Sequence, residues 1–154
     1  MKKVRSATRI ISVFVLIFAF VAMMCMFANA FDGEAGCARG NVFSVMFALK
    51  DGYNPVWPLI IGFAGVSLLM IGALAGLLIG EAAGKTLAFV EIGLGLVAGV
   101  LFLFSMMFYS GANPNVDMAS TADNSLGAGS ICVSIFSFVC AGLGVMDLLI
   151  HNKK

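Results

Sequence analysis

The feature that most constrains this 154-residue chain is a set of four long stretches without a charged residue. Each is longer than the ~20 residues that a helix needs to cross a hydrocarbon core of about 30 Å. Lipid offers no hydrogen-bond partners, so a spanning segment must satisfy its own backbone groups, as a helix does. A β-barrel would need alternating segments of about ten residues, whereas these stretches are apolar on every side. The four stretches are Ile10–Phe31, Gly52–Gly80, Ile92–Val116 and Asn124–Met146.

We therefore expect an all-α integral membrane protein, a single domain over residues 1–154 that folds as an antiparallel bundle of four transmembrane helices. The composition agrees, because hydrophobic residues make up 61% and charged residues 11% of the chain. Such a composition excludes a soluble globular domain, a disordered chain and a basic nucleic-acid-binding surface. The predicted helices lie near 10–30, 57–80, 87–110 and 127–150, with outer loops 32–56 and 111–126 and an inner turn 81–86.

The distribution of Lys and Arg predicts the orientation of the bundle. Only Arg39 and Lys50 fall in the predicted outer loops, whereas all other Lys and Arg residues lie at the chain ends or in the inner turn. The positive-inside rule then places both termini in the cytoplasm, and we expect the plasma membrane as the location. Tyr53, Trp57 and Tyr109 fall at predicted outer helix ends, where aromatic rings anchor in the membrane interface.

The first thirty residues have a second interpretation. A basic start, an apolar run and the sequence Ala28-Asn29-Ala30 resemble a cleavable signal peptide. The apolar run Ile10–Phe27 is longer than the roughly 7–15 residues that are usual for such a region. We therefore favour a retained first helix, and N-terminal sequencing of the purified protein distinguishes the two.

Small residues recur at helical spacing on three of the predicted helices. Close approach of helix backbones in a membrane needs small residues on one face. The short inner turn makes the second and third helices antiparallel neighbours, so we expect their glycine faces to meet. The pattern indicates packing within one chain or, alternatively, a dimerisation face. The first helix lacks such a stripe and is expected to be more exposed to lipid. The helix-packing residues are Gly72, Gly76, Gly80, Gly95, Gly99, Ser134, Ser137 and Gly144.

Two acidic residues are expected at membrane depth, where a charge is a functional hypothesis by default. Glu91 lies about one turn into the third helix, and Asp147 precedes His151 by four residues near the end of the fourth. One interpretation is purely structural, with Asp147 pairing with His151 while Glu91 reaches the interface. The alternative is a proton- or cation-linked site formed by Glu91, Asp147 and His151 and centred on Glu91.

The remaining chemistry of the chain is sparse, and we predict no catalytic residues, no metal site and no cofactor. His151 is the only histidine, which argues against a His-based metal site or catalytic triad. Cys25 and Cys132 are expected at similar depths near the outer surface. They either form a disulfide between the first and fourth helices or remain buried free thiols.

The predicted outer loops differ in character. The first contains the apolar patch Val42–Leu49, which is too short to span and whose periodicity fits a strand or a helical turn. We expect it to pack as a lid on the bundle or, alternatively, to form a partner-docking surface. The second loop carries Asp117 and Asp123 and is expected to be solvated, with a weak cation site as the alternative.

Cytoplasmic termini, a longer first outer loop and a short inner turn resemble the claudin-like tetraspan proteins in topology only. The claudin loop pairs a Trp motif with two Cys, whereas this loop has only Cys37 and no Trp before Trp57. We expect a non-enzymatic structural, scaffold or accessory subunit that acts through helix packing and its first outer loop. The alternative is a small proton- or cation-linked transporter or channel component that uses Glu91 and Asp147. The expected partners are the lipid bilayer and a second copy or another membrane protein, but no nucleic acid.

Overall fold

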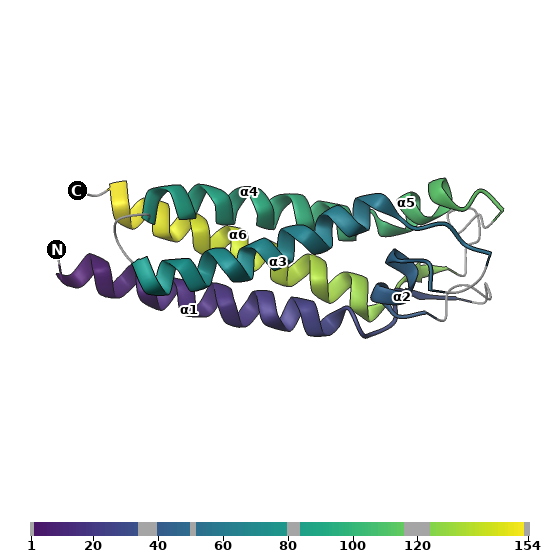
Figure 1. Cartoon of the computed structure of the whole chain (residues 1–154), viewed down its shortest axis with the longest axis horizontal. Coiled ribbons are helices and arrows are strands. Elements are labelled where there is room, and N and C mark those ends of the chain that lie inside the picture. The colour runs from purple at the N-terminus through teal and green to yellow at the C-terminus, as the bar shows by residue number, and fades with distance from the viewer. Residues whose placement is uncertain (1, 34–39, 50–51, 80–83, 116–123, 153–154) are drawn as a thin grey trace.

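The computed structural model of the chain describes residues 2–33, 40–49, 52–79, 84–115 and 124–152. Four long helices run side by side in it (Figure 1): α1 (Lys2–Cys25), α3 (Trp57–Ile79), α4 (Gly84–Leu103) and α6 (Ala128–Asn152). Each contains a segment long and apolar enough to cross a membrane. The predicted helical bundle with four candidate transmembrane helices is therefore confirmed.

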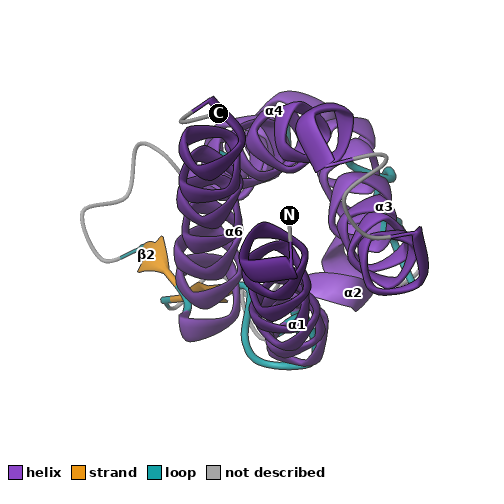
Figure 2. Cartoon of the chain, turned by 90° about the vertical axis from the view of Figure 1, so that its left-hand side faces the viewer, coloured by secondary structure: helices purple, strands orange, loops and turns teal. Residues whose placement is uncertain are grey.

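The four long helices form a closed ring (Figure 2). α1 and α4 each pack against both α3 and α6, and every neighbouring pair is antiparallel. α1 begins and α6 ends at the same end of the bundle, which we call the terminal end (Figure 1). The short elements that connect α1 to α3 and α4 to α6 lie at the opposite end, which we call the loop end.

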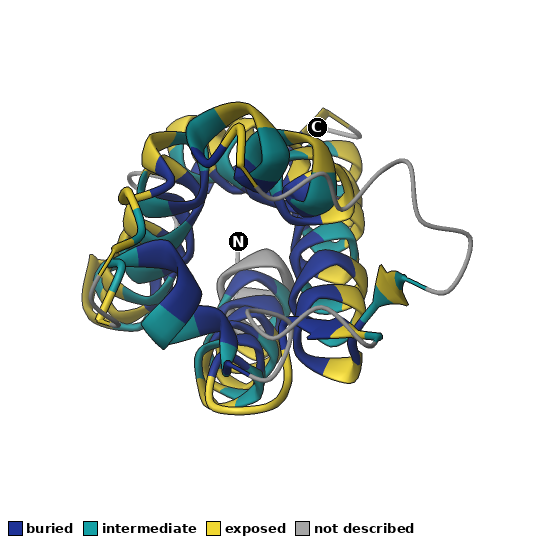
Figure 3. Ribbon diagram, turned by 90° about the vertical axis from the view of Figure 1, so that its right-hand side faces the viewer, coloured by how far each residue is buried: buried dark blue, intermediate teal, exposed yellow. Residues whose placement is uncertain are grey.

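The outside of the ring is apolar on all four helices. Buried residues face inward and exposed residues face outward along each helix (Figure 3). Large hydrophobic side chains are nevertheless exposed, among them Phe20 on α1, Leu78 on α3, Phe89 on α4 and Ile135 on α6. Such a surface suits lipid, because soluble monomers rarely expose extended apolar patches.

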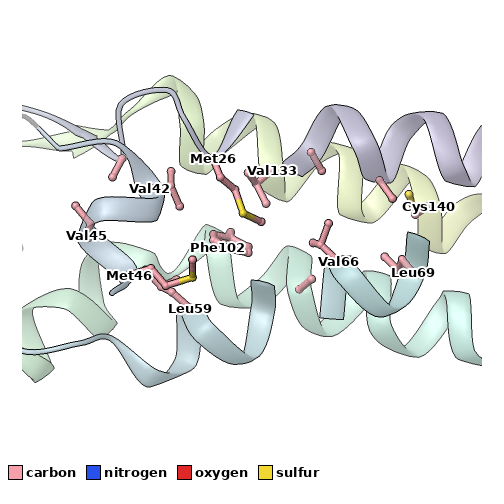
Figure 4. Packing of buried hydrophobic residues seen from close by; sticks show 14 of the residues in the cluster. Met26, Val42, Val45, Met46, Leu59, Val66, Leu69, Phe102, Val133 and Cys140 are labelled. Carbon is pink, nitrogen blue, oxygen red and sulfur yellow. The ribbon is translucent and has the colours of Figure 1, made fainter. Parts of the chain in front are cut away.

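The inside of the ring is filled by one continuous apolar core. It begins at the loop end with Val45 and Met46, passes Phe102 and Val133, and extends to Cys140 and its neighbours near mid-bundle (Figure 4). Phe102 and Met46 have no exposed surface. Further members of the core are Val15, Ala19, Ala22, Met26, Val42, Leu59, Val66, Leu69 and Ala73.

The expectation that the first helix is more exposed to lipid holds against α3 and α6 but not against α4. α1 packs against both α3 and α6, and 33% of its apolar span is buried, compared with 39% for α3 and α6 and 33% for α4. Its inward positions recur every three or four residues, which is the spacing of one helix face. They combine two hydroxyl residues with small and medium apolar ones: Thr8, Ile11, Ser12, Val15, Ala19, Ala22 and Met26.

Two predicted helix boundaries need correction. The first helix ends at Cys25 rather than near residue 30, because the chain turns there and leads into the strand β1 (Phe31–Asp32). The predicted helix 87–110 starts earlier and divides at Phe104 into α4 and α5 (Ser105–Ala112). Hydrogen bonds from Phe104 N to Val100 O (3.0 Å) and from Phe108 N to Phe104 O (3.2 Å) continue across the division.

The apolar patch of the first outer loop forms a short helix, α2 (Val42–Met46). Asn41 caps it, since its Oδ1 accepts a 2.7 Å hydrogen bond from Ser44 N. Val42 and Met46 are fully buried against the bundle. The predicted lid is therefore part of the folded interior at the loop end.

Hydrogen bonds join this lid to the turn after α1 and join that turn to α6. Val42 N donates to Ala28 O (3.1 Å), and Ser130 Oγ donates to Ala30 O (2.9 Å). β1 pairs in antiparallel fashion with β2 (Ser125–Leu126). Gly129 permits the close approach, because a Cβ there would lie 2.7 Å from Ala28 O. We call α2, β1, β2 and the turn 26–30 the cap.

The predicted interface anchor Tyr109 is instead a buried member of the loop end. Its ring lies 5.3 Å from that of Phe31 and 6.4 Å from that of Tyr53. Beneath it, Asn113 Oδ1 accepts a 2.7 Å hydrogen bond from Asn54 N, which ties α5 to the start of α3. Of the three predicted aromatic anchors, Trp57 is strongly exposed, at the first residue of α3.

Candidate functional site: a buried polar cluster

The buried acidic and histidine side chains of the long helices gather inside the terminal half of the bundle. α6 places Asp147 and His151 on its inward face, where they continue the stripe of Ser134, Ser137, Ala141 and Gly144. α4 contributes Glu91 from the face that carries Gly84, Ala88 and Gly95. α1 adds two hydroxyls that sequence reasoning missed, although their spacing from Val15 marks the same face. The polar cluster consists of Thr8, Ser12, Glu91, Asp147 and His151.

Every member of the polar cluster is more than nine-tenths buried. The exposed fraction is 2% for both Glu91 and Asp147 and 6% for His151. The expectation that Glu91 reaches the interface is therefore wrong. α6 approaches α4 closely at Gly144, where a Cβ would lie 3.0 Å from Glu91 Cβ, so the carboxylate is enclosed between the helices.

Asp147 and His151 pair with each other, as the purely structural interpretation of these residues requires. His151 Nδ1 lies 2.9 Å from the carbonyl oxygen of Asp147 and 3.6 Å from its Oδ1. The other ring nitrogen, Nε2, has no hydrogen-bond partner. It lies against Gly84 at the start of α4, where any Cβ would overlap the ring.

Several polar atoms of the polar cluster lack a hydrogen-bond partner. They include Glu91 Oε2, Asp147 Oδ1 and Thr8 Oγ1. The Thr8 hydroxyl lies beside the Asp147 carboxylate without a hydrogen bond of standard geometry. Glu91 and Asp147 are close enough to repel each other when both are charged. Unpaired carboxylate oxygens in an apolar interior are costly, so the charge state of this site matters for the stability of the bundle.

The donor set of the polar cluster limits its chemistry. Within the ranges that the structure describes, no three His, Cys, Asp or Glu side chains come together as ligands of a metal ion. Two carboxylates, one imidazole and two hydroxyls are groups that exchange protons and donate or accept hydrogen bonds. The chemistry that this arrangement can perform is therefore proton binding and release.

The predicted packing glycines do not meet as expected. Gly95 faces α6, where a Cβ would lie 2.6 Å from Ser137 O, and Ser134 Oγ donates a 2.8 Å hydrogen bond to Gly99 O. Gly76 lies against Ser12 of α1 and, like Gly72, against the Leu87 side chain of α4 rather than against a glycine. The sequence shows which residues are small but not which neighbour each one faces. Gly80 lies outside the described residues.

The thiols of Cys25 and Cys132 lie next to each other, within hydrogen-bonding reach. Both are free, so the predicted alternative of a disulfide between α1 and α6 stays a prediction. Cys140 is fully buried, with its Sγ 3.8 Å from Val15 O. The expectations for Cys37 and for Asp117 and Asp123 fall outside the described residues.

These contacts join α1, α4 and α6 around Asp147 at the terminal half, below an apolar core that fills the loop half. The interior therefore distinguishes the two halves of the bundle, whereas large hydrophobic side chains cover most of the outer surface of all four helices. Comparison with protein-family models, with curated proteins and with solved structures finds no significant match to this chain.

Proposed function

We propose that this chain is a non-enzymatic, non-conducting membrane protein that serves as a structural or accessory subunit. It resides in the plasma membrane with both termini in the cytoplasm, and its partner is another membrane protein or a second copy. The observation that carries the proposal is the continuous apolar core between the cap and mid-bundle.

This core bears on conduction because a pore needs a polar or water-filled path through the bilayer. The side chains of Phe102, Met46 and Leu59 are fully buried and occupy the middle of the ring at the loop half. Protein interiors pack as densely as organic crystals, so we expect such a core to leave no continuous path for water through the bundle. A filled bundle is suited to holding a fixed surface in the membrane.

The cap provides a surface that such a subunit would present. Because backbone hydrogen bonds tie α2 to the turn after α1, the cap has a defined position on the bundle. Leu49 beside the cap and Trp57 at the first residue of α3 are 64% and 66% exposed. Exposed apolar and aromatic side chains in a rigid frame are typical anchors of protein interfaces.

A second function, proton- or cation-linked transport, is favoured by one specific observation. The polar cluster places Glu91 and Asp147 inside the bundle, and ionisable groups within membrane segments commonly mark such pathways. Transport would require the apolar core of the loop half to open, because the polar cluster lies in the terminal half alone.

Two measurements on the full chain test the proposal. In proteoliposomes, we expect proton and monovalent-cation flux to equal that of empty vesicles for both the wild type and Glu91→Gln. In native membranes, a photo-crosslinker at Leu49 is expected to give one discrete protein adduct, while the same probe at the lipid-facing Phe20 gives none. Glu91-dependent flux would establish the transport function instead, and identical adduct patterns at both positions would remove the cap as the docking surface.

A further inference from the structure

We propose that the polar cluster is a proton-binding site inside the bundle, at which Glu91 and Asp147 together hold an exchangeable proton that enters from the terminal end. The site is independent of the proposed function, since a structural subunit and a transporter can both contain it. Its evidence is the burial and the unpartnered atoms of groups that three different helices bring together.

The charges of the polar cluster do not balance when both carboxylates are ionised. Glu91 and Asp147 would contribute two negative charges, and a protonated His151 would contribute one positive charge next to Asp147. One buried carboxylate then remains uncompensated, which is strongly unfavourable in an apolar medium. Binding of one proton to a carboxylate oxygen forms an O–H bond, breaks none in the protein and removes the excess charge.

Among the side chains that the structure describes, the charged and titratable groups on the surrounding helices do not change this count of charges. Arg9 of α1 buries its Nε without a partner and forms no ion pair with either carboxylate in the described part of the chain. Lys85 of α4 is exposed, and Cys140 of α6 is the remaining titratable neighbour of Glu91. The described residues of α3 include no titratable side chain. Of the ionisable side chains that are described, Glu91 is therefore the one without a counter-charge.

The arrangement of the polar groups determines from which end of the bundle a proton reaches Glu91. His151 lies at the last turn of α6, with its unpartnered Nε2 against Gly84 at the first residue of α4. Thr8 and Asp147 follow one turn deeper, and Glu91 lies beyond them on α4. Past Glu91 the interior holds buried hydroxyls such as Ser137 and Ser134 among the apolar residues of the core, but no further Asp, Glu or His among the described residues. Carboxylate and imidazole groups thus connect Glu91 with the terminal end only.

The side chains of the polar cluster suit a proton better than a metal ion. No three acidic, His or Cys side chains of the described segments converge on one point as metal ligands would. A proton needs neither a ligand sphere nor a cavity, and a protonated carboxyl group becomes a hydrogen-bond donor for a neighbouring unpaired oxygen. Glu91 Oε2 and Asp147 Oδ1 both lack hydrogen-bond partners, which fits a site where one of the two carboxyl groups is neutral.

Infrared spectroscopy of the full-length protein in liposomes tests the site. We expect a carboxylic-acid C=O band at neutral pH that shifts in D₂O, because the proton exchanges with solvent. The band should disappear completely in Glu91→Gln and remain in Asp32→Asn, a matched control at an exposed carboxylate of β1. Absence of the band from the wild type, or its survival in Glu91→Gln, would overturn the proposal.

A second variant keeps the test decisive where Glu91→Gln fails to fold. Asp147→Asn removes the neighbouring negative charge, so the carboxylic-acid band of Glu91 should titrate away at a lower pH than in the wild type. An unchanged titration midpoint would show that the two carboxylates do not share the site. Disappearance of the wild-type band on addition of NaCl at constant pH would also contradict the proposal, since it indicates a metal cation as the ligand. Neither readout depends on flux, so each can fail separately from the proposed function.

Discussion

Substitution of Gly95 by Ala tests how closely α4 and α6 pack beside the polar cluster. A Cβ at this position would lie 2.6 Å from Ser137 O and 2.8 Å from Ala141 N. Both are backbone atoms, so no side-chain rotation relieves the overlap. Gly93 on the same helix is the matched control, because a Cβ there meets nothing within 4 Å.

The expected cost follows from the geometry. Ordinary van der Waals contact for a Cβ begins at 3.4 Å, so α4 and α6 must move apart by roughly 0.8 Å at Gly95. Overpacking of this kind costs about 1–3 kcal/mol, and a backbone contact belongs at the upper end. Helices stay formed in lipid or detergent when a bundle separates, so the higher helix propensity of Ala contributes equally to both states. We therefore expect Gly95→Ala to lower the free energy of unfolding by about 3 kcal/mol and Gly93→Ala to change it by less than about 0.5 kcal/mol.

The assay is a titration of the folded protein in mild-detergent micelles with SDS, followed by resistance to proteolysis. Both variants should retain the helical content of the wild type, since only the association of helices is perturbed. Equal midpoints for the two variants would refute the reasoning, because they would show that Gly95 does not contact the backbone of α6.

The remaining predictions use the same assay on two further contacts of α6. Ser134→Ala should cost about 0.6–1.7 kcal/mol, because it removes the 2.8 Å hydrogen bond to the α4 backbone. Ser137→Ala should be neutral or stabilising, because its buried Oγ has no partner; equal losses in the two variants would contradict this assignment. Gly84→Ala should destabilise the bundle by displacing the imidazole of His151, and the double variant with His151→Ala should recover most of the loss. Additive effects in that pair would show that the two residues do not touch.

The sequence predicted the number of spans well for a simple physical reason. Backbone polar groups cannot go unpaired in lipid, so a long uncharged stretch has one stable conformation. The sequence predicts a helix that begins at Trp57, and α3 begins at this residue. Helix ends were less predictable, since the turn at Cys25 depends on hydrogen bonds to the distant α2.

The partners of each helix were harder to predict than the helices themselves. The glycine spacing predicts that Gly76 meets the glycines of the third predicted helix, but it lies against Leu87 of that helix and against Ser12 of α1. The role of Ser12 was missed because a hydroxyl among large apolar residues does not stand out. The position of Glu91 about one turn into its helix predicts a carboxylate at the membrane interface, whereas it is buried in the bundle. Its burial depends on Gly144 of α6, and no local pattern shows which two helices will approach each other most closely.

The cap imposes an order on the biogenesis of the protein. Its hydrogen bond from Ser130 Oγ to Ala30 O joins residues 100 positions apart in the chain. At a synthesis rate of about 5–20 residues per second, α1 therefore waits roughly 5–20 s in the membrane before its partner residue is made. During this interval the inward-facing hydroxyl of Thr8 lacks its neighbour Asp147 of α6. Until α6 is made, α1 can pack only against α3, so the fold is completed only when the last span arrives.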